Sequence, residues 1–201
     1  MSRDEGYIKF QNDHQFEKID APDGIFREIS VWRTKLFDLG MIGETPEGIG
    51  YGNISFRYGN NFIITGSATG KKRILEVSGY ALVRSYDYEM NKVQSSGMTR
   101  ASSESLSHAA VYECHTNVNS VIHVHHEKMW KWYLNDLPTT SEKFAFGTPE
   151  MAYDIQRIIK DKAMGSQGIL IMGGHQDGII TFGKSVETAA GILLSHYNSM
   201  G

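Results

Sequence analysis

The chain has 201 residues, and its 20 basic and 23 acidic side chains give a formal net charge of −3. This near balance provides no strongly basic face, so nucleic acid is not expected as the main partner. No run of about 18 apolar residues is present, so the sequence predicts neither a transmembrane helix nor a membrane partner. The only cysteine, Cys114, excludes a disulfide framework and a thiolate zinc cluster, and we expect a cytoplasmic protein.

The length predicts a single domain, residues 1–201, with a substantial buried core. Residues 1–20 are polar and aperiodic, so an N-terminal arm is expected there. In the next segment, residues 22–43, apolar side chains recur three and four positions apart, which predicts an amphipathic helix. These side chains are Ile25, Ile29, Trp32 and Leu36.

Helical and strand patterns then follow one another to the end of the chain. Alternating apolar residues around turn residues predict hairpins at 50–66 and 79–97. Further strands are expected at 119–125, 167–174 and 177–183, and helices at 102–116, 127–138, 148–165 and 185–199. Because hairpins are mixed with helices, the expected fold is a three-layer α/β domain whose central mixed, mostly antiparallel sheet is flanked by helices.

Three of the eight histidines lie within residues 121–126, "VIHVHH". Alternate side chains of a strand share a face, so His123 and His125 project the same way, with Cα atoms roughly 6–7 Å apart. His126 projects from the opposite face. Two imidazoles so placed can bind Zn²⁺ or a similar ion, although two ligands are too few for a stable zinc site. Without further ligands, the same pattern describes a half-exposed structural strand.

A third imidazole, His175, follows an apolar strand in the glycine-rich turn "GGHQDG". Glycines allow the backbone of such a turn to bring a side chain close to a neighbouring strand. Three histidines with an open fourth position are typical of a catalytic rather than a structural zinc site. An isolated histidine in a turn would instead be exposed to solvent.

Glu104 is expected in the first turn of the helix that follows "ASSES". An acid there is favoured by the helix dipole alone, whereas the free N–H groups and serine hydroxyls of a helix start also suit a phosphate. His108, four residues on, would either orient the Glu104 carboxylate or pair with it on the helix surface. Two polar loops, "YGNIS" and "TGSATGKK", are either anion sites or tight turns, and the second lacks the spacing of a P-loop.

Taken in order, these segments resemble the class II aldolase/adducin family. The resemblance rests on "GNIS", "ITGSATG", "SSE", "VIHVH", "FGTPEMA" and the glycine-histidine turn before "GIITFGKSVETA", and it covers about residues 25–197. It implies the three-layer fold described above and a tetramer with active sites between subunits. It also implies a sugar-phosphate substrate and a divalent metal, Zn²⁺ or alternatively Mn²⁺, Co²⁺ or Fe²⁺.

The resemblance also assigns roles to individual residues. His123, His125 and His175 match the family's metal-binding histidines, and Glu104 stands at the position of the catalytic acid/base. The positions that bind phosphate in the family fall on Gly52, Asn53, Thr69, Gly70, Ser102 and Ser103. In the family the last histidine usually precedes a glycine directly, whereas here Gln176 and Asp177 intervene. Either the turn is longer or Asp177 replaces the third ligand.

The resemblance therefore predicts a zinc-dependent aldolase that cleaves a phosphorylated ketose to dihydroxyacetone phosphate and an aldehyde. Such cleavage requires a Lewis acid for the carbonyl and a base to move protons, which the metal and Glu104 would supply. An epimerase or a dehydratase on the same scaffold is an alternative. A non-catalytic, adducin-like interaction domain is another, which retention of His123, His125 and Glu104 disfavours.

Overall fold

An eight-stranded sheet forms the centre of the computed structural model, which describes residues 7–200. Its strand order is β1-β7-β6-β5-β4-β8-β10-β9, and every neighbouring pair is antiparallel except β1 and β7. The strands are β1 (Gln11–Phe16), β4 (Asn53–Tyr58), β5 (Asn61–Thr65), β6 (Tyr80–Asp87), β7 (Lys92–Gly97), β8 (Ser120–His125), β9 (Gly168–Ile171) and β10 (Gly178–Gly183). A separate short pair consists of β2 (Gly43–Glu44) and β3 (Gly50–Tyr51).

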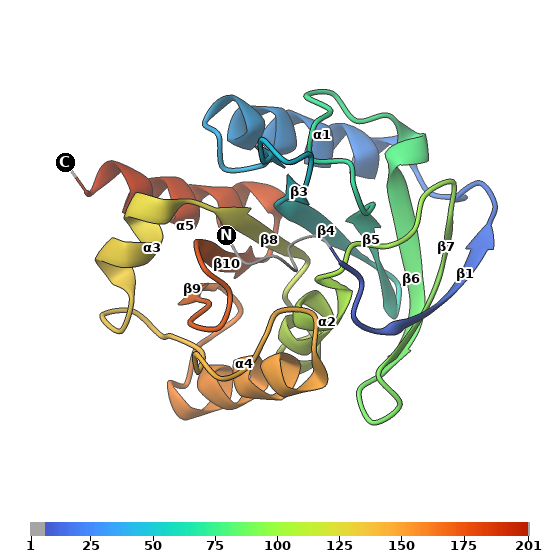
Figure 1. Ribbon diagram of the computed structural model, residues 1–201. Coiled ribbons are helices and arrows are strands. Elements are labelled where there is room, and N and C mark those ends of the chain that lie inside the picture. Colours follow the sequence, from blue (N-terminus) through green and yellow to red (C-terminus); the bar gives the residue numbers. More distant parts are fainter. Residues whose placement is uncertain (1–6, 201) are drawn as a thin grey trace.

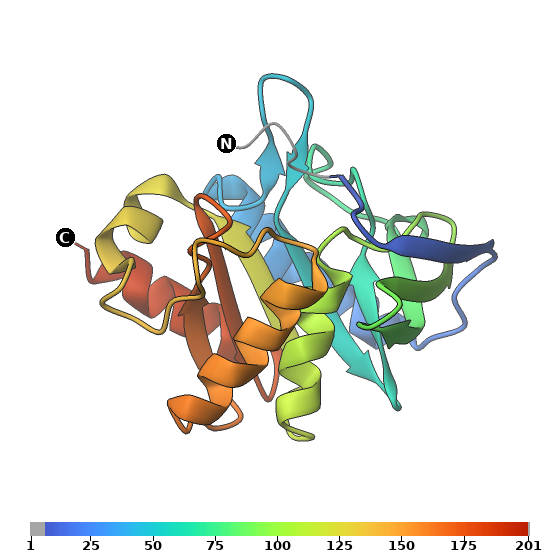
Figure 2. The ribbon, with the colours of Figure 1, turned by 60° about the horizontal axis from the view of Figure 1, so that its bottom comes forward.

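Helices cover both faces of this sheet. They are α1 (Asp23–Asp38), α2 (Ser105–Cys114), α3 (Glu127–Tyr133), α4 (Pro149–Asp161) and α5 (Val186–Asn198), with a short 3₁₀ helix at Val77–Gly79. Figure 1 shows α1 and α5 on one side of the sheet and α2 and α4 on the other. In the turned view of Figure 2, α2 and α4 lie side by side in front of the strands. The predicted three-layer α/β architecture with a mixed, mostly antiparallel sheet is confirmed.

Alternation along the strands divides the core between the two faces. In β8, Val121 packs in the cluster that includes α2 and α4, whereas Ile122 and Val124 pack with α1, α3 and α5. The histidines of this strand follow the same period of two. His123 and His125 therefore share the α2/α4 face with Val121.

The apolar stripe of α1 differs from the one expected. The buried residues of α1 are Phe26, Ile29, Arg33 and Leu36. Ile25 and Trp32 are only partly buried, and the next residue in each case, Phe26 or Arg33, is buried instead. The spacings of three, four and three still satisfy helical geometry. An arginine within the buried stripe is the feature that the sequence pattern does not predict.

The segment expected as an N-terminal arm, residues 1–20, is only partly an arm. Gln11–Phe16 forms the edge strand β1, which pairs in parallel with β7 along its whole length. Edge pairing uses backbone hydrogen bonds and requires no apolar alternation, which explains why a polar sequence forms a strand here. Residues 1–6 of the expected arm lie outside the described part of the chain.

The remaining expected elements agree with the structure apart from their ends. Helix α4, expected over residues 148–165, has Thr148 as its cap and Pro149 at its first position but ends at Asp161, before Gly165. Ala163, with φ of 46°, adopts the left-handed conformation that glycine usually provides after a helix end. Within residues 7–200, no helix combines the length and apolar content that a membrane crossing requires.

Candidate metal centre

His123 and His125 lie on β8, which runs between β4 and β10 in the middle of the sheet. Both side chains are buried, and their Nε2 atoms are 3.1 Å apart. His123 Nδ1 lies 3.2 Å from the carbonyl oxygen of Ile179 on β10, to which it can donate a hydrogen bond. Such a bond leaves the Nε2 lone pair facing the second histidine, which is the usual orientation of a metal-ligating imidazole.

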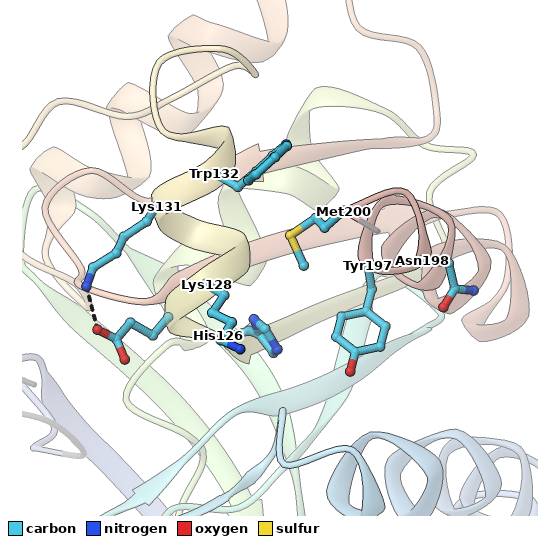
Figure 3. Close-up of a pocket in the computed structure, with 8 residues that line it drawn as sticks. His126, Lys128, Lys131, Trp132, Tyr197, Asn198 and Met200 are labelled. Atoms are coloured by element: carbon cyan, nitrogen blue, oxygen red, sulfur yellow. Dashed lines mark hydrogen bonds and ion pairs between the residues drawn. The ribbon is translucent and has the colours of Figure 1, made fainter.

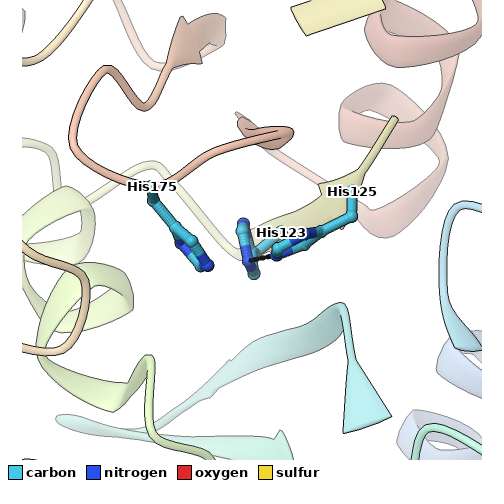
Figure 4. A group of neighbouring side chains, drawn as sticks. All are labelled: His123, His125 and His175. Atoms are coloured by element: carbon cyan, nitrogen blue, oxygen red, sulfur yellow. Dashed lines mark hydrogen bonds between the residues drawn. The ribbon is translucent and has the colours of Figure 1, made fainter. Parts of the chain in front are cut away.

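His175 joins this pair from the turn between β9 and β10. Its ring centroid lies 4.9 Å from that of His123 and 4.6 Å from that of His125. Figure 4 shows the three rings converging from β8 and from this turn. One ligand atom from each residue can be chosen so that all lie within 4.8 Å of one another. The cluster thus has the composition and spacing of a three-histidine metal site.

Close packing of the turn fixes the position of His175. A Cβ atom added at Gly173 would lie 2.2 Å from the Thr140 carbonyl oxygen, and one at Gly174 would lie 1.9 Å from that of Phe144. Only glycine fits at these two positions, so the turn sits directly against the segment that precedes α4. The turn is closed by a 2.9 Å hydrogen bond that the Gly178 N–H donates to the His175 carbonyl oxygen.

Asp177 faces a different environment, although it lies only two residues further along. Its φ is 67°, and its carbonyl accepts a 2.9 Å hydrogen bond from the His126 N–H. Burial raises the pKa of its carboxyl, and the nearby charges include those of Glu127 and Lys131 on α3. Of the two alternatives for the third ligand, the structure brings His175 and not Asp177 to the cluster. The turn is therefore the longer variant.

His126 also lies apart from the cluster, as strand geometry predicts. It caps α3, because its Nδ1 accepts a 3.0 Å hydrogen bond from the Met129 N–H. Its ring packs edge-on against Tyr197, with centroids 5.2 Å apart.

Glu104 lies beside the cluster, with its Oε1 atom 3.4 Å from His175 Nδ1 and 2% of its surface exposed. The sequence predicts Glu104 in the first turn of the helix, but α2 begins at Ser105 and Glu104 itself occupies the cap position. Its carboxylate accepts no capping hydrogen bond from the helix. Instead, the Ser102 carbonyl accepts a 2.7 Å bond from the Ser105 hydroxyl. The Glu104 carboxylate itself lies next to His175 and does not cap the helix.

His108 neither orients Glu104 nor pairs with it on the surface, so both expectations for it are wrong. Its ring is completely buried, and its Nδ1 lies 2.7 Å from Ser55 Oγ, which is also 2.7 Å from Tyr112 Oη. Burial lowers the pKa of His108 to about 3. The residue is a neutral part of a polar network between α2 and β4.

A small polar pocket adjoins the metal cluster. Its wall contains all six residues expected to bind phosphate, Gly52, Asn53, Thr69, Gly70, Ser102 and Ser103, together with Glu104 and His123. Asn53 stands directly opposite His123 in the register of β4 and β8. A Cβ atom at Gly70 would lie 2.8 Å from the Cα atom of Gly50, so the loops on the two sides of the pocket touch through glycine. Two separate polar loops thus form one pocket beside the histidines.

Aromatic side chains that the sequence does not single out surround the cluster. Phe146 stacks on His175 with centroids 4.4 Å apart, and Lys9 Nζ lies 3.9 Å from the centre of the same phenyl ring. The Tyr51 ring lies 5.5 Å from that of His125. The available signals were weak, because Phe146 occurs in "FGTPEMA" and Tyr51 in "YGNIS" without any spacing that indicates a role.

Burial has an electrostatic consequence for the cluster. It lowers the pKa of His123 well below the usual histidine value, and the neighbouring His125 and His175 lower it further. His123 is therefore neutral near pH 7, which is the form that ligates a metal.

Residues 47–197 match the family described as Class II Aldolase and Adducin N-terminal domain. The chain belongs to this family. Among curated proteins, no sequence matches the chain. The predicted family is therefore confirmed by the match to three quarters of the sequence rather than by a near relative.

Solved structures of this family share the fold. L-fuculose-1-phosphate aldolase from Thermus thermophilus is 18% identical, with a TM-score of 0.65 over 89% of this chain and 91% of that chain. A sugar-phosphate aldolase from Thermotoga maritima is 15% identical, with a TM-score of 0.64 over 88% and 92%. YgbL from Escherichia coli, for which aldolase, epimerase and decarboxylase activities are suggested, is also 15% identical, with a TM-score of 0.63 over 88% and 87%. Class II aldolases are typically metal-dependent, in agreement with the three-histidine cluster.

Proposed function

We propose that this protein is a divalent-metal-dependent aldolase that cleaves a phosphorylated ketose to dihydroxyacetone phosphate and an aldehyde. One observation carries the proposal: Glu104 lies 3.4 Å from His175 and lines the polar pocket next to the histidines. An acid/base, a metal cluster and an anion pocket are the three groups that such a reaction requires.

The three imidazoles fit a divalent metal, because they are buried, converge within 4.8 Å and leave coordination positions for substrate oxygens. Zn²⁺ is the metal we propose, and Mn²⁺, Co²⁺ or Fe²⁺ suit the same donors. When bound, the metal supplies Lewis acidity to the carbonyl and the adjacent hydroxyl of the ketose.

Glu104 is the group that moves the proton. In the cleavage direction, the C4 hydroxyl releases its proton to solvent as the C3–C4 bond breaks, which frees the aldehyde and leaves the bonding electron pair on the enediolate of dihydroxyacetone phosphate. Protonated Glu104 then donates its proton to C3. In the reverse direction, its carboxylate removes this proton from dihydroxyacetone phosphate. Gly52, Asn53, Thr69, Gly70, Ser102 and Ser103 would hold the phosphate at a fixed distance from the reacting carbon, which lowers the entropic part of the barrier.

Replacing Glu104 with glutamine tests the proposed base. Glu104→Gln keeps the size of the side chain but removes the basic carboxylate. We expect it to retain the metal and to lose exchange of the C–H proton of dihydroxyacetone phosphate with D₂O, followed by ¹H NMR. Glu113→Gln, on the exposed face of the same helix, is the matched control and should exchange normally. Unchanged exchange in Glu104→Gln would disprove the assigned role.

Other reactions of the same scaffold are distinguished by their products. An epimerase would convert one pentulose phosphate into another, and a dehydratase would release water without breaking a carbon–carbon bond. Incubation with a panel of ketose 1-phosphates and product analysis separates these outcomes from release of dihydroxyacetone phosphate. An adducin-like binding domain would contain no metal and would be unaffected by a chelator.

We also propose that the chain forms a homotetramer. A groove of about 910 Å³ between α3 and the end of α5 supports this, because Trp132, 61% exposed, and Tyr197 lie along it (Figure 3). Tyr197 is half-buried, and aromatic side chains are enriched at protein–protein interfaces. Sedimentation equilibrium should give four times the chain mass of 22.5 kDa, and the mass of a single chain would refute the assembly.

A further inference from the structure

Arg33 is buried in a way that is unusual for an arginine. Its side chain extends from α1 into the interior, with 1% of its surface exposed, whereas buried charges in proteins are normally paired with an opposite charge. Within the described part of the chain it forms hydrogen bonds only to backbone carbonyls. Nη2 donates to Thr69 at 2.9 Å and Gly70 at 3.4 Å, and Nη1 donates to Lys72 and, at 3.1 Å, to Arg73.

All four acceptors belong to one loop, and two of them line the polar pocket. Thr69 and Gly70 are pocket residues, and the Thr69 hydroxyl donates to the Gly66 carbonyl at 2.8 Å, which closes the loop on itself. The far end of the loop is held by the same helix, through a bidentate pair in which Arg73 Nε and Nη2 lie 2.7 Å from the Asp38 carboxylate. Helix α1 therefore fixes the loop at both ends.

These contacts also determine which way the peptide groups of the loop point. The peptide bonds are trans, so each carbonyl and the following N–H point in opposite directions. When the carbonyls of Thr69 and Gly70 turn to Arg33, the N–H groups of Gly70 and Lys71 turn away from it. Within residues 7–200, neither of these N–H groups donates a hydrogen bond. Successive free N–H groups of this kind form the concavities that bind anions.

We propose that Arg33 is a positioning residue for substrate phosphate, an inference that rests on the proposed function. Its guanidinium binds the outer, carbonyl side of the loop and so presents the N–H group of Gly70, which lines the pocket, to the phosphate. The planar guanidinium group carries several N–H donors in a fixed arrangement, so it can donate to four carbonyls at once, whereas a lysine ammonium group cannot. Arg33 does not touch the substrate.

Binding of inorganic phosphate to the zinc-loaded protein, measured by isothermal titration calorimetry, tests this role. In Arg33→Lys the charge remains but the fork is lost, and we expect phosphate affinity to fall about tenfold or more, while zinc content stays at the wild-type level. Arg33→Gln, which keeps planar N–H donors without the charge, should weaken phosphate binding to an intermediate extent. It serves as the second variant if Arg33→Lys does not fold.

Arg57 provides a matched control. It also donates to three backbone carbonyls, those of Val118, Tyr112 and His115, but at a site away from the pocket. Arg57→Lys should lower the melting temperature and leave phosphate affinity unchanged.

The outcomes separate this inference from the proposed function. If wild type binds phosphate and Arg33→Lys binds it equally well, the role of Arg33 is refuted and the proposed function stands. A similar loss of phosphate binding in Arg57→Lys would show a general effect of stability and would also refute it. If wild-type protein binds no phosphate, the phosphate pocket of the proposed function fails, and the role of Arg33 fails with it.

Discussion

His175 and Asp177 lie two residues apart in one turn, yet their side chains occupy different environments. His175 is in the imidazole cluster, whereas Asp177 lies near Glu127 and Lys131. We therefore expect His175→Ala to lower zinc affinity on the order of 100-fold or more, since even indirect partners of metal ligands are worth 10–100-fold.

Asp177→Asn is the matched change for this prediction, because it removes a carboxylate from the same turn without altering its shape. This variant should keep the zinc affinity of wild type. Zinc content after dialysis against a graded series of chelator concentrations measures both variants. Loss of zinc in Asp177→Asn with retention in His175→Ala would reverse the assignment of the third ligand.

At the scale of elements, the hairpin β9–β10 delivers His175 only because its turn packs against the segment before α4. A methyl group at Gly174 would lie 1.9 Å from the Phe144 carbonyl oxygen, so the backbone of the turn must move to admit it. We expect Gly174→Ala to destabilise the fold by about 1–3 kcal/mol and to weaken zinc binding, because the turn carries His175, the proposed third ligand. Urea unfolding and zinc titration measure the two effects.

Gly191, within α5, is the control for this substitution. Within residues 7–200, nothing outside its own stretch of helix lies within 4 Å of the Cβ position there, so alanine adds no clash and favours the helix. Gly191→Ala should stabilise the protein by about 0.5–1 kcal/mol and leave zinc affinity unchanged. Equal stability changes in the two variants would show that the packing of the turn is looser than the structure indicates.

For the molecule as a whole, buried histidines make the metal-free fold sensitive to acid. The pKa of His108 is about 3 in the folded state against 6.5 in the unfolded chain, and the pKa of His123 is lowered in the same direction. The neutral forms are thus favoured by folding. Their contribution to stability is complete above pH 6.5 and is lost as the pH falls from 6.5 towards 3, by up to about 1.4 kcal/mol per pH unit for each group.

Urea unfolding of metal-free protein between pH 7 and pH 5 measures this loss. His108→Gln, which cannot take up a proton, should show a shallower pH dependence than wild type, even though removal of the bond to Ser55 lowers its stability at every pH. An identical slope in the variant would mean that His108 is not one of the groups that titrate on unfolding.

The sequence by itself determined most of the elements, the family and most of the residues around the centre. Period-two alternation places His123 and His125 on one face of β8 regardless of the rest of the fold. Turn residues and caps locate both hairpins and the helices, because these signals depend on neighbours within about four positions. The six pocket residues could be named from order along the chain, since each belongs to a short motif.

Tertiary structure alone decided what depends on contacts between distant segments. The choice of His175 over Asp177 follows from glycines packed against residues 140–144. The direction of the Glu104 carboxylate follows from where α2 begins relative to the cluster, and the edge strand β1 forms through backbone pairing that side-chain patterns do not record. The burial of Arg33 against a loop 36 residues further along has the same origin. Such contacts join residues far apart in sequence, and local periodicity carries no information about them.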